Sequence, residues 1–237
     1  MSDVLAELSD QVAARLTERR PPHVVGIGGP VAVGKSTIAE GLASAMVDRG
    51  RRVRIVATDC FLLTNEVLAD RGLTFLKGFP ESFDLRAVTR FVQDVKERAP
   101  RIEIPVYSHA LYDVMPDEKV VIEGADLVIL EGVVTLQAPV VRLLDAGIYV
   151  DADEDTVKSW FVERFVRLTE RAKRDPTSFY ASFADLSDAR LIELANATWD
   201  SINGVNLRQH IAPSKRNADF IVTKAMDHSL VRLSPNS

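Results

Sequence analysis

Cysteine is nearly absent from this sequence. Cys60 is the only one among 237 residues, so the chain forms no disulfide within itself and offers no thiolate metal site. Proteins without disulfides are typical of reducing compartments, and we therefore expect a cytoplasmic setting.

Long hydrophobic runs are missing as well. No stretch approaches the roughly 20 apolar residues that a membrane-spanning helix requires. The first residues carry Asp3, Glu7 and Asp10 and lack the basic start and continuous apolar core of a signal peptide. The sequence predicts neither a membrane partner nor secretion.

An excess of positive charge is the third absence. The net charge is −5 and the isoelectric point is about 5.5, so we expect no nucleic-acid partner. Hydrophobic residues make up 46% and charged residues 27%, as in ordinary globular proteins. The length fits one α/β domain, which we assign to residues 1–237, with residues 1–20 as an N-terminal amphipathic helix.

The hydrophobic pattern alternates between strand and helix. Buried strands are expected at 23–27, 53–57, 127–130, 148–150 and 220–222, and helices at 37–48, 154–171 and 188–203. This alternation predicts a P-loop NTPase type of α/β fold, a mostly parallel sheet with helices on both faces. Such sheets bind ligands beyond the carboxyl ends of their strands.

A glycine-rich motif follows the first expected strand and opens the first helix of the sheet. Residues 29–36 read GPVAVGKS and match G-x-x-x-x-G-K-[ST] at every fixed position. Its backbone N–H groups and the helix N-terminus would bind phosphates, Lys35 would reach the β- and γ-phosphates of ATP, and Ser36 would ligate Mg²⁺. The predicted nucleotide-binding residues here are Gly29, Val31, Ala32, Val33, Gly34, Lys35, Ser36 and Thr37.

Two acidic residues end neighbouring strands on the same edge. Asp59 follows the strand at 53–57, and Glu131 follows the strand at 127–130. Phosphoryl transfer requires one carboxylate to deprotonate the acceptor hydroxyl and another to hold magnesium. We predict that Asp59 is the base and that Glu131 belongs to the metal site, acting through water.

From Gly26 to Leu233 the chain resembles type I (bacterial) pantothenate kinases, which are part of the phosphoribulokinase/uridine kinase group. The resemblance rests on several separated stretches rather than on the phosphate loop alone. They are residues 31–37, 58–62 (TDCFL), 77–82 (KGFPES), 105–109 (PVYSH), Tyr112-Asp113, 129–132 (ILEG), Trp160, Arg164, Phe165, Asn206-Leu207, Lys224 and Asp227-His228.

This resemblance implies ATP, Mg²⁺ and phosphorylation of the primary hydroxyl of pantothenate in coenzyme A biosynthesis, and it implies a homodimer. It assigns Asp59 to catalysis, Arg164 to the transferring phosphate, and His228 to the adenine. The pantothenate pocket would be lined by Asp59, Lys77, Tyr107, His109, Tyr112, Phe161, Arg164 and Asn206.

The chain also departs from the family pattern. Phe161 replaces a tyrosine that hydrogen-bonds the substrate, and Glu40 replaces an arginine that contacts the feedback inhibitor coenzyme A, so we expect weak inhibition by coenzyme A. Val134 and Cys60 replace an asparagine and a glycine near the site. The segment before the first strand is about two dozen residues, shorter than the family's, where it contributes to the nucleotide pocket.

Two other functions remain open on the sequence. A kinase with the same mechanism would phosphorylate a different small hydroxyl compound, such as a sugar or a nucleoside. A nucleotide-hydrolysing regulator would need no acceptor, but the sequence has no Asn-Lys-x-Asp guanine motif and would leave residues 107–113 without a purpose.

Overall fold

The computed structural model describes residues 3–17 and 20–236. A six-stranded sheet runs through the molecule in the order β2-β5-β1-β6-β7-β8. The strands are β1 (His23–Gly28), β2 (Val53–Ala57), β5 (Leu127–Glu131), β6 (Ala146–Asp151), β7 (Phe220–Lys224) and β8 (Leu230–Pro235). The first five are parallel, as the sequence predicted, and β8 pairs antiparallel with β7.

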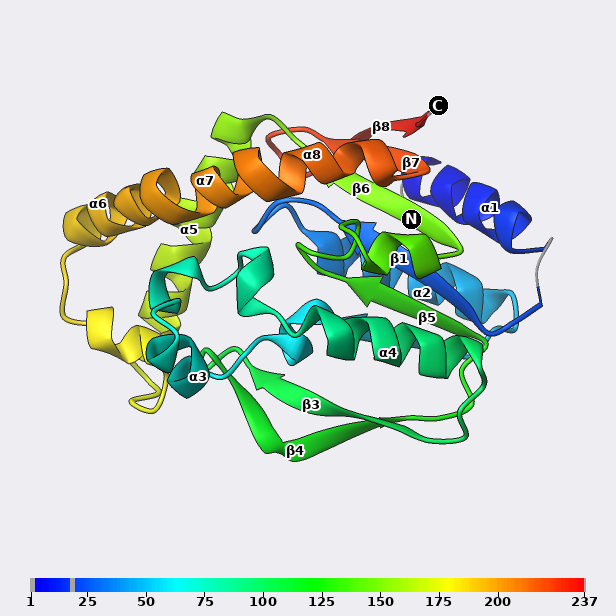
Figure 1. Ribbon diagram of the computed structural model, residues 1–237. Coiled ribbons are helices and arrows are strands. Elements are labelled where there is room, and N and C mark those ends of the chain that lie inside the picture. The colour runs from blue at the N-terminus through cyan, green and yellow to red at the C-terminus, as the bar shows by residue number, and fades with distance from the viewer. Residues whose placement is uncertain (1–2, 18–19, 237) are drawn as a thin grey trace.

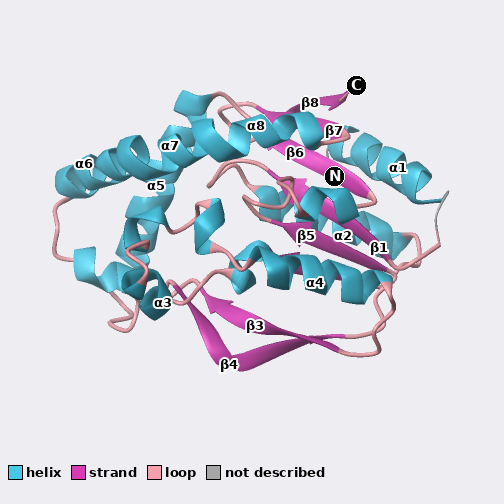
Figure 2. Ribbon diagram, viewed as in Figure 1, coloured by secondary structure: helices cyan, strands magenta, loops and turns pink. Residues whose placement is uncertain are grey.

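Helices cover both faces of this sheet (Figure 2). They are α1 (Asp3–Thr17), α2 (Lys35–Asp48), α3 (Asn65–Asp70), α4 (Leu85–Lys96), α5 (Glu154–Ala172) and a long run that starts with α6 (Asp188–Thr198). That run continues through two π-helical segments, with α7 (Gly204–Asn206) and α8 (Ala212–Ser214) between and after them. No helix in the described ranges is long and apolar enough to cross a membrane.

The buried strands feed two hydrophobic cores because successive side chains point to opposite faces. Val25 and Ile129 pack in the core beneath α1, α2 and α5, whereas Val24 and Val128 pack in the core beneath α4. All six residues of β1 are buried, as expected for a central parallel strand.

A separate two-stranded hairpin, β3 (Ile102–Ser108) and β4 (Asp113–Ile122), lies beyond α4 (Figure 1). Ile102, Ile104 and Ile122 extend the α4-side core. The hairpin's far end, at Ser108 and Asp113, reaches the segments that follow β2, because β3 contacts the 3₁₀ turn Thr58–Phe61.

Candidate active site

The strand register places the predicted site residues at one edge of the sheet. Ala57 of β2 and Ile27 of β1 both pair with Glu131, at the carboxyl end of β5. Asp59 follows in the turn Thr58–Phe61, and the glycine-rich loop follows β1. Parallel strands therefore bring together the two carboxylates and the loop, which are separated by about a hundred residues of chain.

The loop has the conformation of an anion nest. Ala32 and Gly34 have positive φ angles of 64° and 90°, and Gly34 is the N-cap of α2. A Cβ on Gly29, whose φ is 140°, would lie 2.4 Å from the backbone oxygen of Val150, so only glycine fits there. This backbone and the N-terminus of α2 are suited to bind phosphate groups.

Lys35 is buried at the centre of the site. Its Nζ donates a hydrogen bond to the Pro30 backbone oxygen at 2.8 Å. Burial lowers the pKa of Lys35. The negative charges of Glu131 and Asp59 act to raise this pKa, and the positive charge of Arg164 acts to lower it further. One ammonium group thus interacts with both predicted carboxylates and with the predicted arginine. In the described part of the chain, Arg164 makes no ion pair.

Ser36 and Glu131 form a direct contact at the same edge. The Ser36 hydroxyl donates to Glu131 Oε1 at 2.8 Å. Among the described residues, no group of three or more His, Cys, Asp or Glu is arranged to hold a metal. The Ser36 hydroxyl and the Glu131 carboxylate are oxygen donors of the kind that Mg²⁺ takes, and Mg²⁺ is commonly held by one or two side chains together with waters and substrate phosphates.

On the hairpin side, Lys77 connects the loop after α3 to the turn between β3 and β4. Its Nζ donates to Asn65 Oδ1 at 2.6 Å and to the Tyr112 backbone oxygen, and lies 4.3 Å from the Tyr112 ring centroid. Burial lowers the pKa of Lys77, against the attraction of Asp113 and Asp59. The structure therefore brings Lys77 to the predicted acceptor side.

Tyr107 and Tyr112 border the same region. Burial raises the pKa of Tyr112 to about 12 and raises that of Tyr107 as well, so both phenols are neutral hydrogen-bond donors at neutral pH. Tyr112 stacks on Phe179 with ring centroids 4.7 Å apart. Phe179 and its neighbour Tyr180 come from a 3₁₀ turn after α5 that the sequence did not predict as part of the site.

Asn206 closes this side from the long helical run. It is buried, and its Nδ2 donates to the Gly78 backbone oxygen at 2.7 Å. Its Oδ1 has no hydrogen-bond partner in the described structure. A buried amide oxygen without a partner is costly unless a ligand or water supplies a donor.

Two predicted substrate residues, His109 and Phe161, lie at the margin of this region rather than within it. His109 is exposed and touches the site through the edge of Tyr107, at 5.1 Å between ring centroids. Phe161 packs against Trp199 at 5.7 Å, on the border of the main core. Val134 is fully buried in a small cluster with Leu62 and is therefore a packing residue.

The segment after β7 contributes the last group. His228, predicted beside the adenine, is exposed and stacks on Trp160 at 4.3 Å. Lys224, to which the sequence gave no role, donates to the Val33 backbone oxygen at 3.0 Å and so lies at the glycine-rich loop. The family resemblance includes Lys224 but assigned it no role, and its contact with the loop forms only in the fold, which brings the two together from 191 residues apart.

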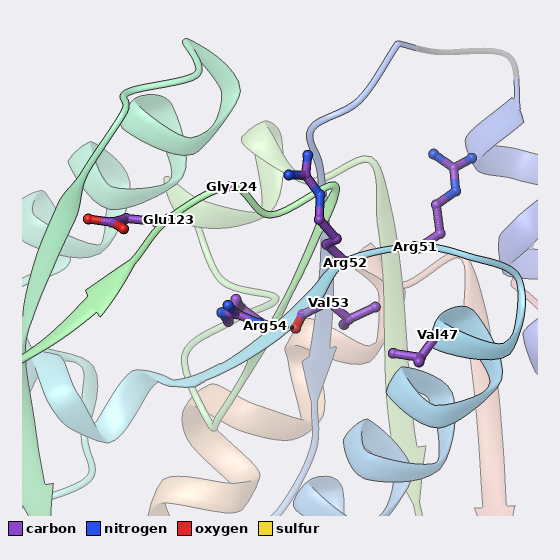
Figure 3. Close-up of a pocket in the computed structure, with 7 residues that line it drawn as sticks. All are labelled: Val47, Arg51, Arg52, Val53, Arg54, Glu123 and Gly124. Atoms are coloured by element: carbon purple, nitrogen blue, oxygen red, sulfur yellow. Dashed lines mark hydrogen bonds between the residues drawn. The ribbon is translucent and has the colours of Figure 1, made fainter.

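A depression of about 540 Å³ occurs elsewhere, at the amino end of β2. Figure 3 shows the side chains of Arg51 and Arg52 extending side by side with their guanidinium groups separated rather than converging on one ligand. Arg52 is already paired with Asp126 at 2.9 Å. The residues that line this depression are therefore not arranged as a second anion site. They are Val47, Arg51, Arg52, Val53, Arg54, Glu123 and Gly124.

Curated relatives match most of the chain. It is 41% identical to a protein named pantothenate kinase from Photorhabdus laumondii and 42% identical to one from Yersinia pestis (strain Pestoides F), in each case over 90% of this chain and 71% of the relative.

Solved structures agree on the fold. A kinase provisionally assigned to fructose transport in Silicibacter sp. TM1040 superposes with a TM-score of 0.72 and 26% identity, over 90% of this chain and 95% of that one. A D-glycerate 3-kinase from Cryptococcus neoformans superposes with a TM-score of 0.70 and 15% identity, over 99% of this chain and 100% of that one.

The sequence pattern of the phosphoribulokinase/uridine kinase family matches residues 24–174. This range begins at the second residue of β1 and extends two residues past α5, so it includes the glycine-rich loop, both carboxylates and Arg164. The chain therefore belongs to the phosphoribulokinase/uridine kinase family of P-loop kinases.

Proposed function

We propose that this chain is a pantothenate kinase, which transfers the γ-phosphoryl group of ATP to the primary hydroxyl of pantothenate in coenzyme A biosynthesis. The observation that carries the proposal is that Lys35 of the glycine-rich loop interacts electrostatically with Glu131 and Asp59, which lie at the carboxyl ends of the strands, and with Arg164 of α5. The identity of the acceptor is supported by the relatives named pantothenate kinase.

In this reaction Asp59 takes the proton of the acceptor hydroxyl. The hydroxyl oxygen forms a bond to the γ-phosphorus, the bond from that phosphorus to the β–γ bridging oxygen breaks, and ADP leaves. Lys35 and Arg164 stabilise the charge on the moving group, since both are cations held at the phosphate loop or beside it. Ser36 and Glu131 would hold Mg²⁺, which supplies charge neutralisation on the phosphates.

The acceptor pocket is proposed to lie between the hairpin turn and the long helical run. Lys77, Tyr107 and Tyr112 line it on the hairpin side, with His109 at the rim. Asn206 lines it opposite and has an unpaired Oδ1 available for a substrate donor. The base of ATP is proposed to lie beside His228.

A kinase that acts on a different small hydroxyl compound is the second candidate. The observation that favours it is Phe161, whose ring has no hydroxyl to donate and packs against Trp199. The fold neighbours named for fructose transport and D-glycerate show that this architecture occurs in proteins named for other acceptors.

The test is ADP formation by purified protein with Mg·ATP and a panel of acceptors: pantothenate, D-glycerate, hexoses and nucleosides. We expect pantothenate to give the highest kcat/KM. Turnover confined to another compound would reassign the acceptor, and ATP hydrolysis at the same rate without any acceptor would favour the regulator. The homodimer, the cytoplasmic setting and the weak inhibition by coenzyme A expected from the exposed Glu40 stay predictions.

A further inference from the structure

Three contacts join the Trp160 side chain to the end of β7 and to the short segment that follows it. The indole Nε1 donates to the Met226 backbone oxygen at 3.1 Å. The His228 ring stacks on the indole with 4.3 Å between centroids and 23° between planes. The Lys224 ammonium lies 5.1 Å from the indole centroid.

Trp160 is a fixed support for these contacts. It is 4% exposed and is part of the main core, on the α5 helix that also carries Arg164 one turn later. His228, by contrast, is exposed and has a φ of 66°, and its ring packs against the indole of Trp160. No other aromatic ring in the described structure contacts His228.

Lys224 connects Trp160 to the phosphate loop. Its Nζ bonds the Val33 oxygen at 3.0 Å and lies 2.7 Å from the point where a Cβ on Gly34 would sit. Burial lowers its pKa, and no carboxylate of the described residues forms an ion pair with it. The Val33 backbone oxygen and the indole face are thus the groups that stabilise this buried cation.

We propose that Trp160 is a positioning residue for the nucleotide: it holds Lys224 at the phosphate loop and His228 beside the base. In this role Trp160 touches neither the phosphates nor the base of the nucleotide. The inference rests on the proposed function, since it assumes that a nucleoside triphosphate occupies the loop. Trp160 thereby connects the phosphate side of the nucleotide site, at Lys224, with the base side, at His228.

The test compares Trp160→Leu and Trp160→Phe with the matched control Trp199→Phe. Trp199 is the other tryptophan, is 2% exposed and belongs to the same core, but it contacts Phe161 rather than Lys224 or His228. The dissociation constants of Mg·ATP and of magnesium inorganic triphosphate are measured by calorimetry, together with Tm.

We expect Trp160→Leu to weaken Mg·ATP binding about tenfold, because it removes both the stacking surface and the cation–π contact. Inorganic triphosphate has no base, so its binding falls by a smaller factor. Trp160→Phe keeps an aromatic face and gives an intermediate value, and Trp199→Phe stays within about twofold of the wild type.

A fluorescence titration covers the case in which Trp160→Leu does not fold. In Trp199→Phe, Trp160 is the remaining tryptophan, and its emission changes on Mg·ATP binding because phosphate neutralises the adjacent Lys224. Unchanged Mg·ATP affinity in both Trp160 variants, or an emission that does not respond, would overturn the positioning role alone. A wild-type protein that does not bind Mg·ATP would overturn the proposed function as well.

Discussion

At Lys35, burial and charge act in opposite directions. Removal from water lowers the pKa of its ammonium, and the nearby Glu131 and Asp59 only partly offset this. Lys224, which bonds the loop at the Val33 backbone oxygen, is also buried, and burial lowers its pKa. Two lysines with weakened protonation therefore face the place where phosphates are proposed to bind.

We expect proton uptake when Mg·ATP binds at alkaline pH. Both lysine pKa values are lowered in the free protein, and a bound polyanion raises them. At a pH between the free and the bound pKa of each lysine, the complex therefore holds more protons than the free protein. Affinity should therefore fall as pH rises above the lowered pKa values of the two lysines in the free protein. Calorimetry in buffers of different ionisation enthalpy measures the uptake, and Lys224→Gln should remove part of it. Zero uptake or proton release would contradict these lowered pKa values.

Phe161 offers a second test at this scale. Phe161→Tyr restores the hydroxyl that the family pattern has at this position, and a donor to a buried substrate group is worth about 1–3 kcal/mol. We expect the KM for pantothenate to fall about tenfold, with the KM for ATP unchanged. Steady-state kinetics with each substrate varied in turn provides the readout. A fall in the KM for ATP, or an unchanged KM for pantothenate, would place Phe161 outside the acceptor pocket.

At the scale of elements, α5 supports both halves of the site, since it carries Trp160, Phe161 and Arg164. Its first turn is capped by Asp153, whose side chain accepts from the backbone N–H groups of Asp155 at 3.0 Å and Thr156 at 3.4 Å. The cap satisfies donors that the helix itself leaves free.

Asp153→Ala should lower the free energy of unfolding by about 1 kcal/mol, because it removes this cap. The neighbouring Asp155→Ala is the control: it changes the same net charge but makes no cap, so its effect should be smaller. Urea denaturation gives both values. Equal losses in the two variants would mean that charge near the helix N-terminus, rather than the capping hydrogen bonds, stabilises α5.

Elements with a regular hydrophobic period were predictable. The five parallel strands and helices α1, α2 and α5 appear where the sequence placed them, within a few residues. The hairpin β3–β4, helix α4 and edge strand β8 were not predicted. The hairpin is half exposed and interrupted by a register shift at Pro105, so it lacks the continuous apolar run of the parallel strands.

The site divides in the same way. The spacing of the glycine-rich loop and the position of acids after strands led directly to Lys35, Ser36, Asp59 and Glu131. Lys224, Phe179 and Tyr180 come near these residues only through the packing of distant elements. The expected helix at 188–203 also continues through π-helical segments that set the position of Asn206, which no local propensity indicates.

At the scale of the whole molecule, one sheet separates two cores and shares its strands between them. Leu127 and Ile129 of β5 pack on the α1 side, while Val128 and Leu130 pack on the α4 side. The α4-side core also receives Ile102, Ile104 and Ile122 from the β3–β4 hairpin, but both cores depend on the six-stranded sheet. The single domain expected from the sequence stays a prediction; it requires that unfolding one face of the sheet removes the support of the other.

We therefore expect one cooperative unfolding transition. Both tryptophans lie in the α1-side core and report on it by fluorescence, whereas far-ultraviolet circular dichroism reports on all helices and strands. The urea midpoints from the two probes should coincide. Two separated midpoints would show that the hairpin and α4 unfold independently of the main core.

The most direct test of the central claim is the rate of pantothenate phosphorylation by the wild type and by Asp59→Asn, measured with Mg·ATP and product detection by mass spectrometry. The account predicts phosphorylated pantothenate from the wild type and a loss of about 10²–10⁴-fold in kcat for Asp59→Asn, because the amide cannot take the hydroxyl proton. Mg·ATP should bind both proteins with similar affinity. Equal kcat values in the two proteins would contradict Asp59 as the base, and no product from the wild type would contradict the proposed acceptor.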